Sequence, residues 1–448
     1  MTQLSEHPSV KKFRERAAAV VAESKPTLDA RELRDICLQA GADDVGFVDL
    51  DRPELGNERN EILRFFPHTK ALISFVVRMN RQPIQNPARS VANVEFEQTG
   101  ARVNETAHHI VATLEARGIR AINPAMGFPM EVGNFGAGRL WVIAHKTVAV
   151  AAGLGQMGIH RNVIHPKFGN FILLGTVLVD AGISEYQQPI DYNPCVECKL
   201  CVAACPVGAI ASDGAFNFSA CYTHNYREFL GGFTNWVEQI ADSKDATDYR
   251  RRVTDGESVS MWQSLSFGAN YKSAYCMAVC PAGDDVLPPF LTDRPKYLQD
   301  VVKPLQDKEE TVYVVPQSDA EDYVARHFPN KHTKHVGNSL NRLRSIGAFL
   351  NGLPQTFQRN QAKGLNATYH FTFTGAEVRR ATITIRNQKL EVSDGHLGDA
   401  DFVVTADSKT WLGFLAKERN LVWALLRRRI RVKGSPRLLL AFGKCFPS

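Results

Sequence analysis

The sequence predicts a chain of three units that differ in fold class. Strands that alternate with helices over residues 1–185 predict an α/β domain. Seven of the nine cysteines fall in one central stretch, which predicts a small α+β domain built around a metal cofactor over residues 186–290, with an insertion at 222–272. Residues 291–337 are predicted to be a linker, and alternating strands over residues 338–448 predict a second α+β domain.

Within the α/β domain, each element follows from a local residue pattern. The nearly unbroken apolar run at residues 71–77 predicts a strand that is buried on both faces. Thr27 and Asp29 can cap a helix that ends at Gly41. The other predicted elements are helices at residues 8–24 and 102–117 and strands at residues 45–48, 119–122 and 171–179.

The predicted last domain contains a β-hairpin. Residues 381–386 and 389–392 alternate as strands, and Asn387-Gln388 joins them as a two-residue turn. The other elements predicted here are a helix within residues 340–357 that stops near Gly352, strands at 368–373, 402–404 and 430–432, and helices at 411–418 and 436–444. Together they predict a meandering antiparallel sheet.

The bulk composition excludes several classes of protein. A formal net charge of +6 is mild for 448 residues and predicts no nucleic-acid partner. The triplet Arg427-Arg428-Arg429 is interpreted as a solvated helix end, with an anionic lipid or partner surface as the alternative. No apolar stretch approaches the roughly 20 residues that a transmembrane helix needs. The first twelve residues carry no hydrophobic signal region, so we expect a cytoplasmic protein.

Four of the central cysteines follow the spacing Cys195-x2-Cys198-x2-Cys201-x3-Cys205-Pro206. This spacing is typical of bacterial ferredoxins, where three thiolates of the run bind one [4Fe–4S] cluster and the fourth, before proline, binds a second cluster. A structural zinc site is the alternative, but the C-x2-C pairs of zinc sites usually lie far apart in the sequence. Reduced thiols in the cytoplasm are free to bind iron.

A second motif, Cys276-x3-Cys280-Pro281, is predicted to supply the crossing ligands. Cys280 completes the first cluster together with the first three cysteines of the run. Cys205, Cys221 and Cys276 then hold the second cluster. The sequence therefore predicts two [4Fe–4S] clusters.

The second cluster lacks one expected cysteine. Its fourth ligand belongs three residues before Cys276, where the chain has Ser273. A serine oxygen or water on one iron, a three-iron cluster and a labile cluster all remain open, and His224 and Tyr275 are candidate substitutes. A single open iron is also a candidate substrate site.

Three glycines within six residues, Gly153, Gly155 and Gly158, let a backbone approach a bound group closely. The spacing fits Gly-x-Gly-x-x-Gly. No clear strand precedes it, however, and Pro166 and Gly169 interrupt the helix that should follow, so a dinucleotide site is disfavoured.

This glycine loop and its surroundings carry a family resemblance. The matching motifs are Ala152-Gly153-Leu154-Gly155-x-x-Gly158, Phe168-Gly169-Asn170 and the ferredoxin-type run. Over roughly residues 28–290 the chain resembles the epoxyqueuosine reductases and the reductive dehalogenases. The resemblance implies a cobamide that receives electrons from a cluster and lies near the three glycines and Asn162.

The chain departs from that family at three points. Epoxyqueuosine reductases carry a catalytic aspartate upstream of the glycine loop, whereas residues 139–151 contain no acidic residue. Ser273 replaces a cluster ligand, and the helical-repeat tail is missing. We therefore do not expect queuosine synthesis. The candidate residues for proton delivery or anion contact are His145, Lys146, His160 and Arg161.

The last domain carries a second resemblance. The matching stretches are Phe349-Leu350-Asn351-Gly352-Leu353-Pro354, Phe371-Thr372-Phe373-Thr374-Gly375, Asp401-Phe402-Val403-Val404-Thr405 and Ile430-Arg431-Val432-Lys433-Gly434-Ser435-Pro436. They resemble the sterol-carrier-protein-2 (SCP-2) domain, which implies an apolar tunnel for an acyl chain or sterol. A purely structural or dimerising role is the alternative.

These observations predict a cytoplasmic iron–sulfur oxidoreductase. We expect it to take single electrons from a ferredoxin or flavodoxin and to pass them to a bound cofactor or to an organic substrate, with a hydrophobic molecule as a candidate substrate. The alternatives are a non-catalytic electron carrier and a lipid-binding redox sensor.

Overall fold

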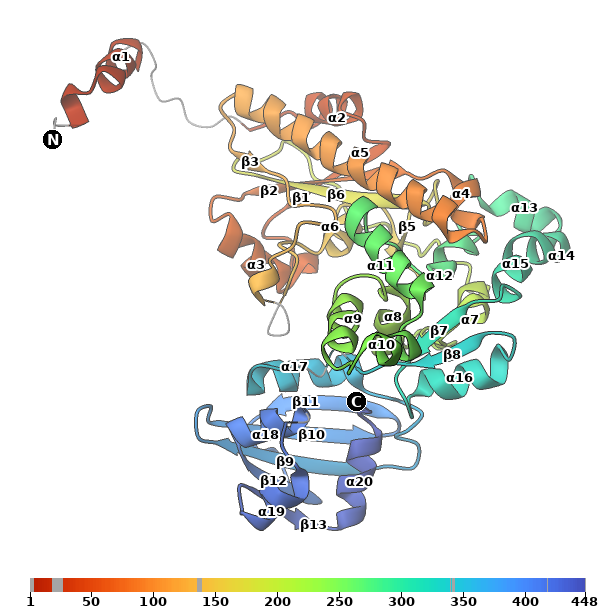
Figure 1. The fold of residues 1–448 in the computed structure, drawn as a ribbon. Coiled ribbons are helices and arrows are strands. Elements are labelled where there is room, and N and C mark those ends of the chain that lie inside the picture. Colours follow the sequence, from red (N-terminus) through yellow and green to blue (C-terminus); the bar gives the residue numbers. More distant parts are fainter. Residues whose placement is uncertain are drawn as a thin grey trace.

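The computed structural model describes residues 4–17, 27–134, 139–338, 340, 343–416 and 418–447. Helix α1 (Pro8–Ala17) covers the first part of the helix predicted at residues 8–24, and the rest of that prediction lies outside the described residues. The architecture is a mixture of α and β elements with several separate sheets, as Figure 1 shows.

The first domain is built on a four-stranded sheet with the order β1-β2-β6-β3, in which every neighbouring pair is antiparallel. Its strands are β1 (Asp44–Asp49), β2 (Ala71–Arg78), β3 (Ala121–Ile122) and β6 (Ile172–Val179). Helices α2 (Ala30–Gln39) and α5 (Arg89–Ala116) cover one face, and α3 (Glu58–Phe65) and α6 (His145–Ala151) cover the other.

Strand β2 shows why the sequence predicted a strand that is buried on both faces. Its side chains alternate between two cores: Ile73 and Phe75 pack with α2 and α5, whereas Leu72 and Val76 pack with α3 and α6. Both faces are therefore apolar, which produces an unbroken apolar run instead of an alternating one.

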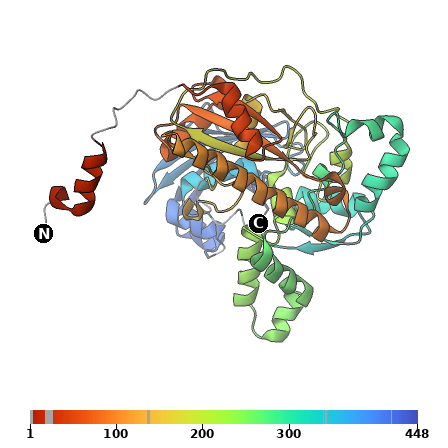
Figure 2. The same cartoon turned by 90° about the horizontal axis from the view of Figure 1, so that it is seen from above.

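The cysteine-bearing domain is small and helical. Its helices are α7 (Leu200–Ala204), α8 (Phe218–Asn225) and α12 (Tyr275–Ala278). Between α8 and α12 the predicted insertion forms three further helices, α9 (Gly231–Ala241), α10 (Ala246–Arg252) and α11 (Asp255–Phe267). In Figure 2 part of this green segment projects from the body of the molecule.

The prediction of a linker over residues 291–337 is wrong for most of its length. The segment holds α13 (Leu287–Thr292), α14 (Arg294–Tyr297), a π-helix (Leu298–Val302), α15 (Lys303–Gln306), β7 (Thr311–Val314), α16 (Asp319–His327) and β8 (His332–His335). Strands β7 and β8 pair in parallel. The prolines that suggested a linker stand in the first turns of short helices, where their missing N–H costs nothing.

The last domain has a five-stranded sheet with the order β11-β10-β9-β12-β13. Its strands are β9 (Ala367–Thr374), β10 (Arg379–Arg386), β11 (Lys389–Asp394), β12 (Phe402–Asp407) and β13 (Ile430–Gly434). Asn387 and Gln388 both have positive φ, as a two-residue hairpin turn requires. The predicted all-antiparallel meander is wrong at one place: β12 leaves the hairpin and pairs with β9 in parallel.

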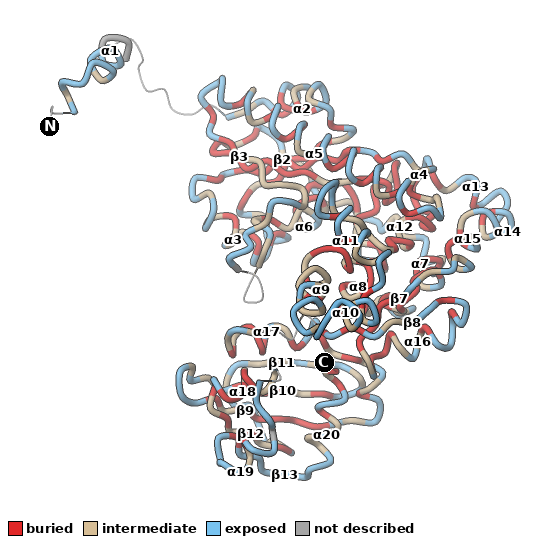
Figure 3. Tube along the Cα trace, in the orientation of Figure 1, coloured by how far each residue is buried: buried red, intermediate tan, exposed pale blue. Residues whose placement is uncertain are grey.

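Helices α17 (Ile346–Thr356), α18 (Ser408–Leu415), α19 (Leu421–Leu426) and α20 (Pro436–Lys444) accompany this sheet. The core of the domain is rich in aromatic side chains, among them Phe349, Phe371, Phe373 and Trp411. Figure 3 shows buried backbone concentrated in the strands of the first and last domains. Among the residues that the structure describes, no helix combines the length and the apolar character needed to cross a membrane.

Candidate metal centres

Four cysteines from both motifs line one recess. Cys195, Cys198, Cys201 and Cys280 surround an empty volume of about 260 Å³, part of which opens to solvent. Cys195 and Cys198 lie in the loop that leads into α7, Cys201 lies in α7 itself, and Cys280 follows α12. We call these four residues the first cysteine set.

The local backbone explains how the loop gathers its thiols. Glu197 and Lys199, on either side of Cys198, have φ values of 48° and 63°. Non-glycine residues adopt this left-handed region rarely, and such conformations cluster at functional sites. The two turns wrap the chain around the recess instead of letting it run straight into α7.

Three other cysteines form the second cysteine set: Cys205, Cys221 and Cys276. Burial, together with the neighbouring Cys205, raises the pKa of Cys276 to about 12. Burial also raises the pKa of Cys221, with contributions from Cys205 and Cys276. The three thiols are therefore close enough to repel one another as thiolates, and a bound cation would relieve this repulsion.

The two sets are neighbours. Burial raises the pKa of Cys201 to about 12, and Cys276 of the second set contributes more to this rise than Cys198 does. Among the described residues, no three His, Cys, Asp or Glu side chains are close enough to share a single metal ion. The thiolates around an iron–sulfur cubane bind different irons and so do not need to share one.

Ser273 is occupied by the protein itself. Its Oγ donates a hydrogen bond to Asn225 Oδ1 over 3.1 Å. The same Oδ1 accepts the backbone N–H groups of Ser273 and Ala274. Ser273 is buried, so the hydroxyl has exchanged water for this amide oxygen.

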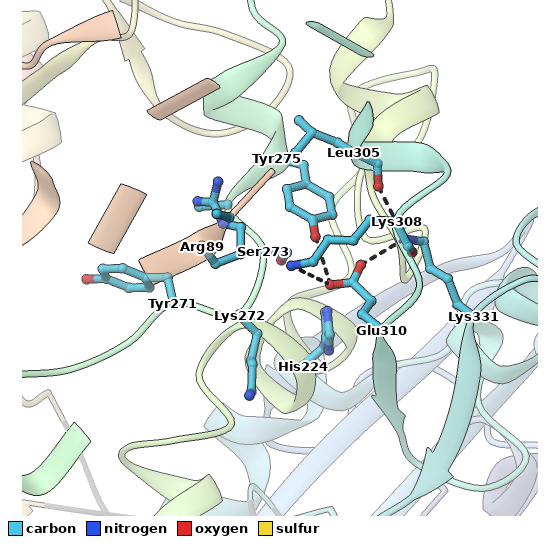
Figure 4. A network of polar contacts seen from close by, with 12 residues as sticks. Arg89, His224, Tyr271, Lys272, Ser273, Tyr275, Leu305, Lys308, Glu310 and Lys331 are labelled. Atoms are coloured by element: carbon cyan, nitrogen blue, oxygen red, sulfur yellow. Dashed lines mark hydrogen bonds and ion pairs between the residues drawn. The ribbon is translucent and has the colours of Figure 1, made fainter. Parts of the chain in front are cut away.

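The two other candidate substitutes for the missing ligand differ in how they are engaged. The Tyr275 hydroxyl donates to Glu310 over 2.7 Å, so it is occupied within the protein. His224 Nδ1 accepts the backbone N–H of Tyr313 over 3.4 Å, whereas its buried Nε2 has no partner among the described residues. Figure 4 shows both side chains beside Glu310.

Glu310 is the centre of the polar network in Figure 4. It accepts hydrogen bonds from Tyr275 and from Lys331 Nζ, the latter over 2.9 Å, and the side chain of Lys331 is only 1% exposed. Burial raises the pKa of Glu310, but His224 and Lys331 outweigh it and hold this pKa below its usual value. The network joins β7 to α8 and α12 and is structural.

Lys146 and Tyr226 adjoin the second cysteine set. Lys146 Nζ donates to Arg161 O and to Asn162 Oδ1, each over 2.8 Å. Lys146 is exposed on one side, but the protein atoms packed around it lower its pKa, while Cys276 and Cys221 favour its charged form. Burial raises the pKa of Tyr226, and the same two cysteines raise it further. Tyr226 belongs to no spaced motif in the sequence, so it was not predicted as a site residue.

Asn162 links these groups to the thiols. Its Nδ2 lies 4.0 Å from Cys276 Sγ as a long N–H···S contact, while its Oδ1 accepts from Lys146. Its backbone N–H donates to His160 Nδ1 over 3.1 Å. One short stretch of chain therefore touches both cysteine sets.

The four candidate catalytic residues lie in different parts of the site. His160 lines the recess of the first set, is 4% exposed, and its Nε2 has no partner. Burial lowers its pKa to about 4. His145 uses both ring nitrogens, toward Thr176 Oγ1 over 2.9 Å and Ala125 O over 3.0 Å. The prediction of proton delivery by His145 is therefore not supported, because neither nitrogen is free.

Lys146 stands beside the second set, and Arg161 offers it a backbone oxygen. The side chain of Arg161 is exposed and its φ is 64°. Of the four candidates, Lys146 is the one whose charged group lies near the second set of thiols.

The three glycines are explained by packing inside the protein. A Cβ on Gly153 would meet Gln188 O at 2.4 Å, and a Cβ on Gly155 would meet Ile164 O at 2.3 Å. A Cβ on Gly158 would meet the Ile164 side chain at 2.7 Å. The loop runs into a small hairpin, β4 (Gln156–Met157) with β5 (Val163–Ile164), where a dinucleotide fold would have a helix. Contact of these glycines with a cofactor remains a prediction.

Two family models match the chain. Residues 189–211 match a 4Fe-4S binding domain, and residues 350–447 match the SCP-2 sterol transfer family. The first match contains the run of four cysteines. The second covers the last domain from α17 to its end.

Curated proteins resemble part of the chain. An epoxyqueuosine reductase from Cellulophaga algicola is 30% identical over 133 residues, which are 27% of this chain and 42% of the relative. One from Staphylococcus aureus is 36% identical over 80 residues, which are 18% of this chain and 20% of the relative. The chain thus spans less than half the length of these relatives.

Solved structures give a weaker likeness. A catabolic reductive dehalogenase in complex with 3-bromo-4-hydroxybenzoic acid has a TM-score of 0.37 and 14% identity, over 61% of this chain and 34% of the other. An epoxyqueuosine reductase bound to a tRNA stem loop has a TM-score of 0.30 and 14% identity, over 72% of this chain and 83% of the other.

The resemblances read from the sequence are therefore confirmed. The chain is similar to the epoxyqueuosine reductases, carries a 4Fe-4S binding domain, and ends in a domain of the SCP-2 type.

Proposed function

We propose that the chain is an iron–sulfur oxidoreductase with one cluster in each cysteine set. The observation that carries the proposal is the crossing of the two motifs. Cys280 of the second motif lies in the recess of the first three cysteines of the run, and Cys205 of the run lies with Cys276 of the second motif. Two-cluster ferredoxins exchange ligands in this way.

Clusters bound in these sets would supply one-electron transfer. The residues around the two sets suit different tasks. The first recess reaches the surface at Val196, which is 44% exposed, and suits the docking of a ferredoxin or flavodoxin in the cytoplasm. The second set lies beside Lys146 and Tyr226, where we place the electron acceptor. Lys146 would hold a positive charge and a proton there, and Asn162 would fix its position.

The family resemblance implies a cobamide as that acceptor. The residues of this chain give no independent sign of it, because the three glycines pack against their own protein and both ends of the Asn162 amide are engaged. The proposal therefore stops at a bound cofactor or an organic substrate beside Lys146.

Protein purified without oxygen tests the proposal. We expect seven or eight irons per chain from a complete first cluster and a second cluster of three or four irons, with matching inorganic sulfide and an EPR signal on reduction with dithionite. About one cobalt per chain after growth with cobalamin would identify the acceptor as a corrinoid. A colourless protein that holds zinc would overturn the assignment.

We also propose that the last domain binds an acyl or sterol-like molecule in its apolar core. The match to the SCP-2 sterol transfer family supports this, as does the aromatic character of the core around Phe371 and Trp411. Native mass spectrometry of the full chain should show an adduct that organic extraction removes. An unliganded mass after incubation with fatty acids and sterols would contradict it.

A non-catalytic electron carrier is the second candidate function. It is favoured by the acid-free stretch at residues 139–151 and by the engaged ring of His145. Clusters that cycle between oxidised and reduced states, in a protein without cobalt that turns over no organic acceptor, would support it.

A further inference from the structure

One end of the last domain exposes large apolar side chains among arginines. Val422 and Trp423 are 62% and 61% exposed, and Leu426 and Leu440 are each 69% exposed. Exposed basic residues lie close to them in the sequence. We call the following residues the terminal surface: Val422, Trp423, Leu426, Arg427, Arg428, Arg429, Arg431, Lys433, Arg437 and Leu440. Figure 1 shows its elements, α19, β13 and α20, at the end of the molecule away from the first domain.

The exposure follows from how α19 is held. Asn420 Oδ1 caps the helix by accepting the backbone N–H groups of Val422 and Trp423. Ala424 is 6% exposed and belongs to the core, so the helix turns its small residue inward. Leu425 packs against the same core, whereas Val422, Trp423 and Leu426 are left outside. Exposed large apolar side chains that gather on one short helix mark an interaction site.

The charge around this surface has one sign. Residues 419–448 contain eight Lys and Arg and no Asp or Glu. The whole chain has a net charge of +6, so the preceding residues together are slightly negative. The guanidinium of Arg427 lies 5.6 Å from the centre of the Trp423 ring. A cation and an aromatic ring are therefore presented side by side.

We propose that the terminal surface docks on an anionic lipid bilayer, with Trp423, Val422 and Leu426 at the depth of the headgroups and the arginines on the lipid phosphates. Helices that lie in a membrane interface combine Trp and aliphatic residues on one face with Lys and Arg around them. Long cationic side chains reach the phosphates while their stems cover apolar surface.

The positive charge of the terminal surface favours anionic lipids over uncharged ones. Its exposed apolar residues favour a bilayer over a nucleic acid as the partner. RNA would use the arginines and could stack on Trp423, but it offers nothing to Val422, Leu426 and Leu440. The inference is independent of the proposed redox function, because it rests on the last domain alone. It also gives that domain access to the membrane from which a lipid would be taken.

Flotation of the full chain with large vesicles tests the proposal. We expect binding to vesicles of 70% phosphatidylcholine and 30% phosphatidylglycerol, at least tenfold weaker binding to pure phosphatidylcholine, and weaker binding as salt is raised. Trp423→Ala and the triple variant Arg427→Gln/Arg428→Gln/Arg429→Gln should each weaken binding at least tenfold.

The chain offers matched controls for both changes. Trp262 on α11 is 58% exposed, so Trp262→Ala removes an equally exposed indole elsewhere. Arg250, Arg251 and Arg252 end α10, so changing all three to Gln removes the same charge elsewhere. Both controls should bind vesicles like the unchanged chain. Circular dichroism confirms that each variant is folded.

Three outcomes would overturn the proposal. The first is binding that the α10 triple variant loses as much as the terminal triple variant does. The second is equal binding to charged and uncharged vesicles. The third is binding of tRNA that depends on Trp423 while charged vesicles are ignored, which would assign the surface to nucleic acid.

Discussion

The two cysteine sets lie side by side but are built differently. The first has four thiols around one recess, and the only histidine that lines it, His160, is buried and neutral. The second has three thiols, a serine engaged by Asn225, and a cationic neighbour in Lys146. The comparison teaches that two neighbouring thiol sets in one domain can differ in ligand number and in local charge. The proposed function uses this difference when it places the electron acceptor beside the second set.

Removing one thiol from each set is the strongest test of this comparison. Cys280→Ser should abolish the first cluster and lower the iron content by about four per chain, because each set holds its own cluster. Cys221→Ser should abolish the second cluster and leave the first. Cys445→Ser, which changes a buried cysteine of the last domain, should leave iron unchanged. Loss of all iron in both ligand variants would mean that the sets are not separate.

Completing the second set should remove the difference. Ser273→Cys places a thiol where the crossed ligand pattern expects one, so the second cluster should gain about one iron if it is a three-iron cluster. Its EPR signal in the oxidised protein should then disappear. Ser273→Ala removes the hydrogen bond to Asn225 without adding a ligand, and it should keep that signal. An unchanged iron count and spectrum in Ser273→Cys would show that a fourth ligand is already present.

Lys146→Met should remove the positive charge that distinguishes the surroundings of the second set from those of the first. Loss of a positive charge near Cys276 and Cys221 should lower the midpoint potential of the second cluster by several tens of millivolts, with the first cluster changed less. Lys146→Arg, which keeps the charge, should lie close to the unchanged protein. Equal shifts of the two cluster potentials would show that the Lys146 charge is not closer to the second set than to the first. Redox titration followed by EPR gives both values.

The smallest effect should come from His160. Because Asn162 N–H donates to its Nδ1, the neutral ring carries its proton on the unpartnered Nε2, which can donate to a cluster sulfur. His160→Phe should lower the first potential by roughly 40 mV, the value of about 1 kcal/mol for one electron.

His160→Gln, which keeps an N–H donor, should recover part of that loss. Because burial lowers the His160 pKa to about 4, the ring stays neutral from pH 8 down to pH 5, and its contribution to the potential should not vary over that range. A potential that rises steeply between pH 7 and pH 6 in the unchanged protein, and not in His160→Phe, would show that the ring titrates there.

The spacing of residues in the sequence was enough to predict how the cysteines group and where the regular strands lie. The crossed pattern predicted that Cys280 joins the first three cysteines of the run, and the structure places it there. The hairpin at Asn387 was predicted because its pattern is local. The parallel pairing of β9 with β12 was not, because the two strands are separated by a complete hairpin.

Other features depend on contacts that no local pattern reveals. Helix α5 begins at Arg89, well before the predicted residue 102, because its N-terminal turns pack against α4 (Arg81–Gln85) and the loop around Tyr271. The place of Lys146 and Tyr226 beside the second set arises from three separate segments of the chain. The glycine loop suggested a ligand, but the backbone atoms of Gln188 and Ile164 explain its glycines.

The Glu310 network has a consequence for dissecting the molecule. Lys331 and Glu310 belong to the stretch mistaken for a connector, where they pair with each other, and Glu310 also accepts the Tyr275 hydroxyl of the cysteine domain. A truncated protein that stops near residue 290 would therefore leave Tyr275 without its acceptor, so the stretch has to be kept with the cysteine domain. A cut near residue 338 would also break contacts, because Gln358 and Asn360 of the last domain bond to Asn217 and Asp319.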